Sequence, residues 1–457
     1  MQPQTRLPFV LKIAGWRPSV YQRYGRFGWA TLSPPPFGIS LPQHDTFSFF
    51  TTSGGGDTFD PEITKPTGGE ARWTLGPDGD EVGNSISHEF ADDTQKTIVL
   101  TVDNFNFVTA IDFQDDKIKG LLNLEEFGML VDIQLGINPD LTGVVFPAHD
   151  NLMTRVLVAN CGLSGVVDLT GLTRLAGTVR FNNSTMSDIL FPDSSEDINV
   201  LYVFQSGLSG TLDISGLTGL GGVIAAYQSG SLQNVTFPLT SRSITLFYFF
   251  SCDLTGIFDI SPLTGLGGNV NISSNPNLTS IVNPASSNNI TNYQVNGCDL
   301  TTLDVSGLTS LSGTFYAYLN PSLEQIVWPA SVNIATLYAY NCNIGYDSAW
   351  IPILKTNLGN FRIQNNALSQ ADVDSWINDI YSNRSDFKSA AKTLNISGDN
   401  AAPSGSFQAP AGYIQADEVT AGDDGAPETA KEQMYVLVNQ NIDNTTDKKY
   451  NWTITSN

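Results

Sequence analysis

The sequence predicts a mainly β protein whose long central part is a solenoid. A short motif recurs at a spacing of about 46 residues, and the segments between its copies alternate apolar and polar residues as strands do. Charged residues make up only 15% of the chain, whereas Gly, Ser, Thr and Asn are abundant. Because each unit of a solenoid contacts only its neighbours, we expect function to lie on the long surface that the units build together.

Each repeat unit contains two turns with different motifs. In the first turn a Gly-Leu-Ser-Gly-like motif precedes a stretch that begins with Asp and ends with Leu-Thr. In the second turn an alternating segment is followed by Asn-Pro and then Leu. Copies of the first motif begin at Gly162, Gly207, Asp253 and Asp299, and the stretches after them span 168–173, 213–218, 259–264 and 304–309; the second motif spans 133–141, 270–278 and 315–323.

Together the two motifs resemble the leucine-rich repeat, in an irregular form of about 23 residues per turn. The resemblance implies a solenoid over residues 108–402 with about a dozen turns, and strands ~4.8 Å apart would make it about 60 Å long. We expect the Asn at the bend to be buried, because its amide can satisfy peptide groups that the bend leaves unpaired.

The four cysteines occupy the bend position of the first turn type, and Ser206 occupies it in the remaining copy. Equivalent cysteines are two or more turns apart, which is about 10 Å or more at the strand spacing, whereas a disulfide needs Cα atoms within about 7 Å. We therefore expect Cys161, Cys252, Cys298 and Cys342 to be buried free thiols that replace Asn. As such they say little about the redox compartment.

Residues 1–44 are predicted to be a basic, aromatic docking arm. They contain five basic residues and no acidic one, which leaves 17 basic against 45 acidic residues, a balance of −28, in the rest of the chain. The arm has no core of its own and contains a stiff Pro-Pro-Pro break at 34–36, so we expect it to order against a partner; a disordered tail or an extra strand is the alternative. Its characteristic residues are Arg6, Lys12, Trp16, Arg17, Arg23 and Arg26.

This end lacks the apolar core of a secretion signal, and no run approaches the ~18 apolar residues of a membrane span. Residues 45–107 are expected to form a small β-sandwich, with strand-like runs at 46–51, 71–75 and 96–102. The order of Trp73, the turn 78–80, the segment 88–90 and the strand 99–102 resembles the immunoglobulin-like PKD domains. The acidic residues Asp78, Asp80 and Glu81 could hold Ca²⁺, but a solvated turn is the simpler interpretation, so no metal site is predicted.

A capping helix is expected at about residues 369–390, where it would cover the last apolar face of the solenoid. Ser369 and Asp372 form a capping-box-like start, and Val373, Trp376, Ile377 and Ile380 follow helical spacing. Residues 403–457 are predicted to be a linker and a small C-terminal β-hairpin with strands near 433–438 and 450–455.

The segment 366–369 and the ending Leu-Asn-Ile-Ser-Gly at 394–398, followed by Ala-Pro-Ser-Gly at 402–405, carry a second resemblance. They are similar to leucine-rich-repeat structural and tail-fibre-like proteins of bacteriophages, above all of phages that infect Bacteroidetes. The resemblance covers about the last two thirds of the chain. It implies a protein exposed on the virion and supplies no enzymatic residues to carry over.

No catalytic constellation is recognised, so neither an enzyme nor a cofactor is predicted. His44, His88 and His149 are far apart and lack the spacing of metal ligands, and Gly54-Gly55-Gly56 lacks the Lys-Ser/Thr of a phosphate loop. The acidic body argues against nucleic acid, because phosphate contacts need clustered Lys and Arg. A polysaccharide-cleaving enzyme is a lesser alternative, since its two acids can come from distant segments.

The strands of the solenoid are expected to place aromatic residues on the outward face. Counted from the bend, Leu201, Val203, Phe247 and Phe249 point inward, and aromatic residues alternate with them. Such a strip has three interpretations: it binds glycan by stacking, it is buried against a subunit or a virion protein, or the register is off by one and it is core. Its residues are Tyr202, Phe204, Tyr227, Tyr248, Phe250, Tyr316, Tyr318, Tyr338 and Tyr340.

These observations lead to the hypothesis of a non-enzymatic structural virion protein of a bacteriophage: a spike, a tail fibre or a capsid-associated protein. Its arm would dock on other virion proteins within an oligomer of the particle. The repeat surface would recognise a host glycan or protein, or would brace the particle. The alternative is a bacterial cell-surface adhesin or glycan-binding leucine-rich-repeat protein.

Overall fold

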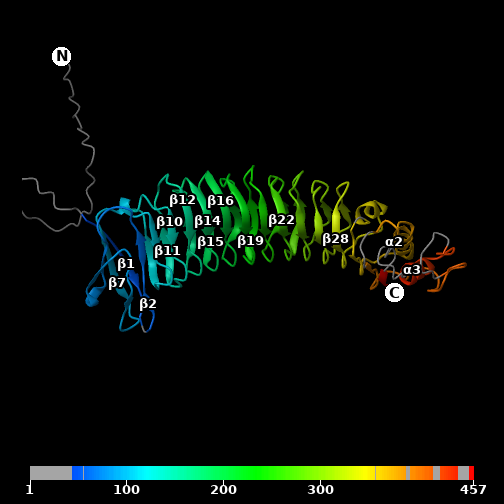
Figure 1. Ribbon diagram of the computed structural model, residues 1–457, viewed down its shortest axis with the longest axis horizontal. Coiled ribbons are helices and arrows are strands. Elements are labelled where there is room, and N and C mark those ends of the chain that lie inside the picture. Colours follow the sequence, from blue (N-terminus) through cyan, green and yellow to red (C-terminus); the bar gives the residue numbers. More distant parts are fainter. Residues whose placement is uncertain (1–43, 55, 356, 388–391, 415–422, 441–451) are drawn as a thin grey trace, which may run out of the picture. The chain divides into compact units, whose positions relative to one another are not determined.

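The computed structural model describes residues 44–457 apart from 55, 356, 388–391, 415–422 and 441–451. The described part, His44–Asn457, is one compact unit, and all the characteristic residues of the docking arm lie outside it. Strands make up 39% and helices 9% of the structure, and the strands form a β-solenoid of about 11 turns (Figure 1). The predicted fold class, a mainly β solenoid of the leucine-rich-repeat type with a C-terminal helix, is confirmed.

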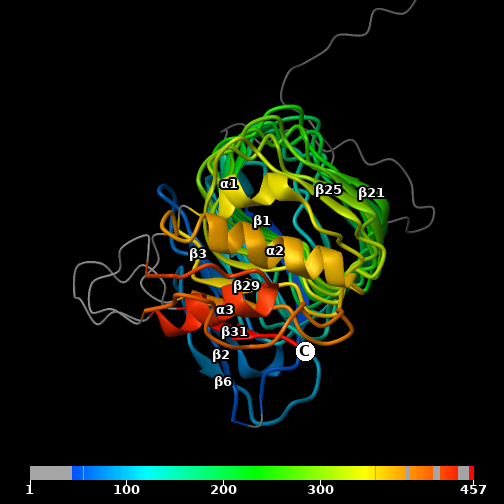
Figure 2. The same ribbon diagram turned by 90° about the vertical axis from the view of Figure 1, so that its right-hand side faces the viewer.

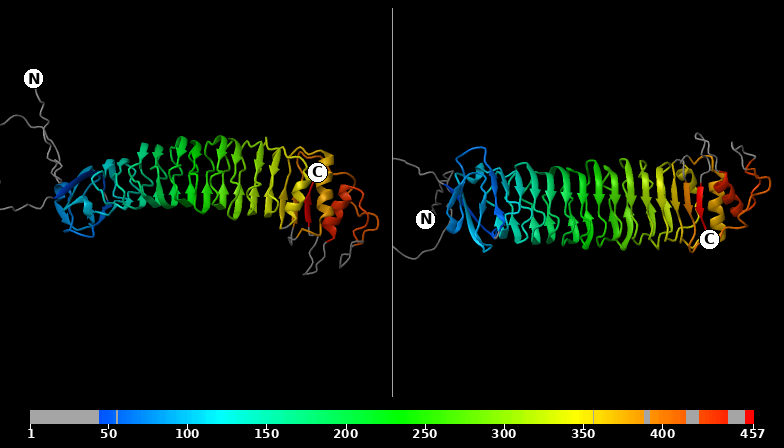
Figure 3. Two further views of the ribbon diagram at one scale, coloured as in Figure 1. Left: turned by 90° about the horizontal axis from the view of Figure 1, so that it is seen from above. Right: turned by 60° about the horizontal axis from the view of Figure 1, so that its bottom comes forward.

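One side of the solenoid is a single 15-stranded sheet, here called the long sheet, to which each turn contributes one parallel strand (Figure 3). Only β3 at its N-terminal end runs antiparallel to its neighbour, β8. In order, the strands are β3 (Glu62–Thr64), β8 (Ala110–Asp112), β10 (Asp132–Gln134), β12 (Met153–Leu157), β14 (Leu175–Arg180), β16 (Ser195–Tyr202), β18 (Leu220–Ala225), β20 (Ile244–Tyr248), β22 (Leu266–Asn271), β24 (Ile290–Gln294), β26 (Ser312–Tyr316), β28 (Asn333–Tyr338), β29 (Asn360–Arg362), β30 (Lys392–Asn395) and β31 (Trp452–Thr455).

The opposite side of the solenoid consists of two-stranded parallel sheets, here called the short sheets. Each joins the two turns of one repeat unit, which is why the sequence repeats every two turns. In three of the four pairs named below, a glycine in the first strand has positive φ, for example 71° at Gly165 and 67° at Gly210, and the register shifts directly after it. The pairs are β13 (Ser164–Asp168) with β15 (Thr185–Leu190), β17 (Ser209–Asp213) with β19 (Ser231–Thr236), β21 (Thr255–Asp259) with β23 (Asn277–Val282), and β25 (Thr302–Asp304) with β27 (Gln325–Val327).

A ladder of buried polar residues holds the bends together, as the sequence predicted. Asn275, which is 0% exposed, donates from Nδ2 to the carbonyls of Phe249 (2.9 Å) and Ile272 (2.7 Å). Its Oδ1 accepts from the peptide N–H groups of Cys252 (3.2 Å) and Leu254 (3.3 Å). The amide therefore joins adjacent turns and satisfies groups that the bend cannot pair. Asn138, Asn320, Asn366 and Asn400 are buried in the same way.

The cysteines occupy the same ladder as free thiols, which confirms that prediction; Cys342 is half-buried and the other three are buried. The Sγ of Cys252 lies 3.3 Å from the carbonyl oxygen of Ala226, and that of Cys161 lies 3.1 Å from the carbonyl oxygen of Leu135. Both thiols donate across the turns as asparagine does. Burial raises the pKa of both thiols to about 11, so they remain protonated at neutral pH.

The N-terminal strands continue the sheets of the solenoid. The strands expected at 46–51, 71–75 and 96–102 are present as β1 (Asp45–Thr51), β4 (Arg72–Thr74) and β7 (Lys96–Val102). Strand β1 also pairs with β9 of the first solenoid turns, and β3 pairs with β8, so hydrogen bonds cross the boundary that we placed after residue 107. The other elements here are β2 (Thr58–Phe59), β5 (Asp80–Val82), β6 (His88–Glu89), β9 (Ile118–Asn123), β11 (Leu141–Val145) and the 3₁₀ turns 76–78 and 105–107.

Helices cover the C-terminal end, where Figure 2 shows α2 (Gln370–Ser382) crossing in front of the stacked turns. Its predicted start is confirmed, because the Ser369 side chain accepts from the Asp372 peptide N–H and the Asp372 side chain accepts from that of Ser369. The helix ends at Ser382, earlier than predicted. Its buried face includes Trp376, whose ring contacts Trp350 at a centroid distance of 5.6 Å. A short helix, α1 (Ile351–Leu354), follows the 3₁₀ turn 348–350.

The predicted C-terminal hairpin is wrong. Residues 433–438 lie in a helix, α3 (Ala430–Asn439), which begins with a second capping box between Thr429 and Glu432. The β-branched residues of this segment favour a strand, but Ala430, Met434 and Leu437 bury one helical face, and burial outweighs propensity. Strand β31 instead joins the long sheet beside β30. Among the described residues, no helix is long and apolar enough to cross a membrane.

Candidate functional site: the outward face of the long sheet

The strip of aromatic residues lies on the outside of the long sheet. The residues expected to point inward, such as Leu201, Val203, Phe247 and Phe249, are 0% exposed. All nine strip residues alternate with them and are half-buried. The register deduced from the sequence is therefore right, and the interpretation of the strip as core is wrong.

The first aromatic cluster is a stack on β16, β18 and β20 and the residues just after them. Phe204 stacks on Tyr227 with ring centroids 4.4 Å apart, and Tyr227 stacks on Phe250 at 4.5 Å. Tyr202 and Tyr248 contact this stack edge to face. The guanidinium of Arg180 lies over the Tyr202 ring at 5.3 Å and ends the cluster toward β14.

The second aromatic cluster lies on β26 and β28. Tyr316 stacks on Tyr338 at 4.8 Å and Tyr318 stacks on Tyr340 at 4.6 Å. The guanidinium of Arg362 lies 4.5 Å over the Tyr338 ring. Burial raises the pKa of the Tyr316 and Tyr340 phenols, which therefore stay protonated and remain hydrogen-bond donors at neutral pH.

Between the clusters lie two strands, β22 and β24, whose outward residues are polar. The register runs from Tyr248 to Asn271, then to Gln294, then to Tyr316, so all four side chains share one face. We call the polar residues of these strands and of the positions just after them the amide gap: Asn269 and Asn271 on β22, Asn292 and Gln294 on β24, and after the strands the buried Ser273 and the half-buried Asn296. The amide gap was not predicted from the sequence, because only the aromatic residues of the face stand out there; an alignment of the turns at the bend reveals it.

Stacking decides which ring faces are available for binding. Phe250 has one face against Tyr227, so its other face points toward β22. Tyr316 and Tyr318 have one face each against Tyr338 and Tyr340, so their other faces point toward β24. Tyr227, which has a stacked ring on each face, presents only its edge and its phenol group. Three unstacked ring faces, those of Phe250, Tyr316 and Tyr318, therefore border the amide gap.

Two register rows of this face have no acidic residue from β14 to β31, whereas Glu196 and Asp197 are exposed near the start of β16. In the two rows of register partners that run from Thr178 to Thr453 and from Arg180 to Thr455, the only charged residues are Arg180 and Arg362. The chain as a whole has 45 acidic residues. Acidic residues are thus absent from the row that contains Tyr202, Tyr248, Tyr316 and Tyr338 and from the row beside it.

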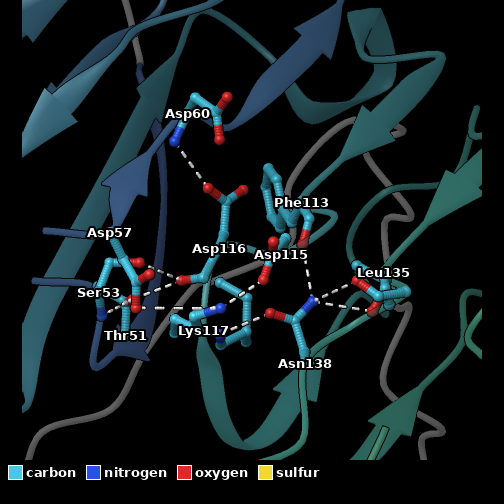
Figure 4. A network of polar contacts seen from close by, with 12 residues as sticks. Thr51, Ser53, Asp57, Asp60, Phe113, Asp115, Asp116, Lys117, Leu135 and Asn138 are labelled. Carbon is cyan, nitrogen blue, oxygen red and sulfur yellow. Dashed lines mark hydrogen bonds and ion pairs between the residues drawn. The ribbon is translucent and has the colours of Figure 1, made fainter. Parts of the chain in front are cut away.

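A second polar network lies where the N-terminal strands meet the first turn (Figure 4). Asp116 is 0% exposed; its Oδ1 accepts from the Asp60 peptide N–H at 2.7 Å, and its Oδ2 has no partner. Its carbonyl oxygen accepts from the hydroxyls of Thr51 (2.5 Å) and Ser53 (2.9 Å). Burial raises the pKa of Asp116 to about 8, so the acid is largely protonated at neutral pH. This network joins the two parts of the fold and was not foreseen.

The described residues contain no group of three or more His, Cys, Asp or Glu side chains arranged to hold a metal ion. Of the residues considered for Ca²⁺, Asp78 and Glu81 instead contact His88, at 3.2 and 2.8 Å.

The comparisons with known proteins give one distant likeness. No family model and no curated protein matches the chain. A solved structure, the functional domain of InlJ from Listeria monocytogenes, which is described as including a cysteine ladder, covers 73% of this chain and 81% of that chain with 14% sequence identity and a TM-score of 0.30. A likeness of this degree says nothing about what the chain binds.

Proposed function

We propose that the chain is a non-enzymatic structural protein of a bacteriophage particle that binds through the outward face of its long sheet. The observation that carries the binding role is the aromatic strip. Solvent-facing aromatic residues that gather on one face mark contact sites, and tyrosine suits them because it has an apolar ring and a polar tip. Five tyrosines and phenylalanines in one cluster and four tyrosines in the other are kept half-exposed on an otherwise polar protein.

The structure at the two ends of the solenoid supports partner binding through its lateral faces. Strands β1 and β3 extend the sheets at the N-terminal end, and α2 covers the last turns. A covered end cannot add further turns, so within the described solenoid the lateral faces remain open to partners.

The assignment to a phage particle rests on the resemblance of the segments 366–369 and 394–405 to leucine-rich-repeat virion proteins. In this proposal residues 1–44 dock on other virion proteins, and the strip meets either the host surface or a neighbouring subunit. A bacterial cell-surface adhesin is the second candidate, and the same strip favours it. Spike, tail fibre and capsid-associated protein all fit the proposal.

The location of the chain tests the proposal. Particles purified from a culture whose phage encodes this chain would be analysed by mass spectrometry, with a major capsid protein as the positive reference. Antibodies against the solenoid would then place it by immunogold labelling. The proposal requires a fixed copy number per particle and label on the virion. Recovery in the cell envelope, with none in particles, would replace it with the adhesin.

A further inference from the structure

We propose that the amide gap and the aromatic clusters on either side of it bind a neutral polysaccharide that lies along the solenoid, across the strands of the long sheet. This names the ligand class of the face to which the proposed function assigns binding, and it rests on that assignment.

The aromatic part of the argument is the placement of free ring faces. Sugar rings present C–H groups on their flat sides, and these pack on the electron-rich faces of aromatic rings. Phe250 offers such a face on one side of the gap, and Tyr316 and Tyr318 offer theirs on the other. These three ring faces lie at the ends of the stacks and have polar side chains beside them. A sugar can therefore pack on a ring and form hydrogen bonds at the same place.

The polar part is the hydrogen-bonding capacity of the amides. A side-chain amide both donates and accepts, as sugar hydroxyls do. Asn292, Gln294 and Asn296 are half-buried and so remain partly open to a ligand, although the Oδ1 atoms of Asn292 and Asn296 are themselves buried and unpaired among the described residues. Gln294 lies between them on the same strand and shares its register row with Asn271. The gap thus offers several amides in two adjacent rows.

Charge favours a neutral ligand. An anionic polymer would be repelled by a body with a balance of −28. The two arginines of the face already lie over Tyr202 and Tyr338 and stand at the outer ends of the clusters, away from the gap. The two register rows contain no charged residue between Arg180 and Arg362, which suits an uncharged ligand.

The extent of the face favours a chain over a single sugar. The aromatic and amide residues follow one another on consecutive strands from β16 to β28, and strands are spaced about 4.8 Å apart. A ligand in contact with both clusters must therefore span several strands. An extended polymer does so, and its repeating units can use the gap and the ring faces together.

Affinity electrophoresis of the full chain in native gels tests the proposal. The gels would contain a neutral β-glucan, α-glucan, mannan, galactan or xylan, or the anionic polymers alginate and hyaluronate. The variant Asn292→Ala/Gln294→Ala/Asn296→Ala removes the two gap amides of β24 and the one just after it. The control Gln233→Ala/Gln325→Ala removes two exposed amides from the short sheets. Circular dichroism and thermal unfolding of each protein would confirm that it is folded.

We expect at least one neutral polysaccharide to retard the wild-type chain and the control, and its dissociation constant to rise about tenfold or more in the triple variant. A second variant, Tyr316→Leu/Tyr318→Leu, keeps apolar bulk without a ring face and should weaken binding as well. The proposal would be overturned if no neutral polymer retarded the wild-type chain, or if only the anionic polymers did. It would also be overturned if a neutral polymer retarded the triple variant as strongly as the wild-type chain. So would a wild-type dimer that the Tyr316/Tyr318 variant dissociates, because a second copy would then occupy the face. A chain found in particles that binds no polysaccharide would overturn this inference and leave the proposed function intact.

Discussion

The ring of Phe204 lies flat against the ring of Tyr227 on the next turn, with centroids 4.4 Å apart and planes inclined by 7°. This contact is on the solvent side of the long sheet, and Tyr227 makes the same contact with Phe250 on the turn after it. Such pairs each contribute about 0.5–1.5 kcal/mol beyond the burial of area. The strip therefore helps to hold turns together while it presents a binding face, and the two roles need separate tests.

Close approach between turns predicts that Gly222→Ala is strongly destabilising. Gly222 has φ of 61°, and a Cβ there would lie 2.1 Å from the carbonyl oxygen of Asn199 on the preceding turn. Gly210 is the matched control, because its φ is 67° but a Cβ would meet nothing within 4 Å. Denaturant unfolding should show a loss of about 1 kcal/mol for Gly210→Ala and a loss of several kcal/mol for Gly222→Ala. Equal losses would show that the backbone conformation alone, and not the spacing of the turns, requires glycine.

The thiol ladder predicts slow alkylation in the folded protein and complete alkylation after unfolding. Burial raises the pKa of Cys298 to about 11 and that of Cys342 to about 12, so little thiolate exists at pH 8. Mass spectrometry after iodoacetamide treatment in denaturant, without a reducing agent, should show all four cysteines modified. A cysteine that is unmodified until reductant is added would contradict the ladder.

The buried acid predicts a pH dependence of stability. Burial raises the pKa of Asp116 to about 8 in the folded protein, well above the ordinary aspartate value of 3.8. The folded state holds this proton to higher pH than the unfolded state does, so its contribution to stability is complete below pH 4 and is lost as the pH rises through 8. At pH 9 the free energy of unfolding of Asp116→Asn should therefore exceed that of wild type by a few kcal/mol. The difference should shrink toward pH 4, as denaturant unfolding at each pH will measure. The exposed Asp140→Asn should show no such trend; a pH-independent difference for Asp116→Asn would refute the assignment.

If residues 1–44 are a docking arm, their removal should abolish assembly into particles without affecting the folding of the solenoid. Deletion of residues 1–43 removes the part of the chain that lies outside the compact unit. The shortened protein should have the same circular dichroism spectrum and unfolding midpoint as the full chain. It should also fail to enter particles when it replaces the full chain during phage growth. Incorporation at the normal copy number would rule out the docking role.

The ladder and the register could be predicted from the sequence because the unit repeats. Several copies of the repeat therefore support the assignment of each bend residue and of each inward or outward position. Asn275 and Cys252 were placed correctly for that reason. Non-repeated features were harder. The run Val436-Leu437-Val438 has strand propensity, yet the capping box at Thr429 and Glu432 and the burial of Leu437 make it helical. The Asp116 network depends on residues 56 to 65 positions apart that only the folded chain brings together.

The amide gap could have been found from the sequence, since its residues follow from the register once turns are aligned. Aromatic residues at solvent-facing positions are unusual and therefore give a clear signal in the sequence. Asn and Gln are common at such positions and give none. The stacking directions could not be found in this way, because side-chain torsions decide whether a ring shows its face or its edge. Those directions place the free faces of Phe250 and Tyr316 beside the gap.

The central claim is that the outward face of the long sheet is a binding surface, and attachment of particles to host cells tests it most directly. The test protein carries Tyr248→Ser, Phe250→Ser, Tyr316→Ser and Tyr338→Ser. The control carries serine in place of four exposed apolar residues of the short sheets, Val166, Ile257, Val282 and Val327. We predict that both proteins fold, because neither set is core, and that only the strip variant loses attachment to host cells or assembly with its partner. A folded strip variant with attachment and assembly equal to wild type would contradict the account.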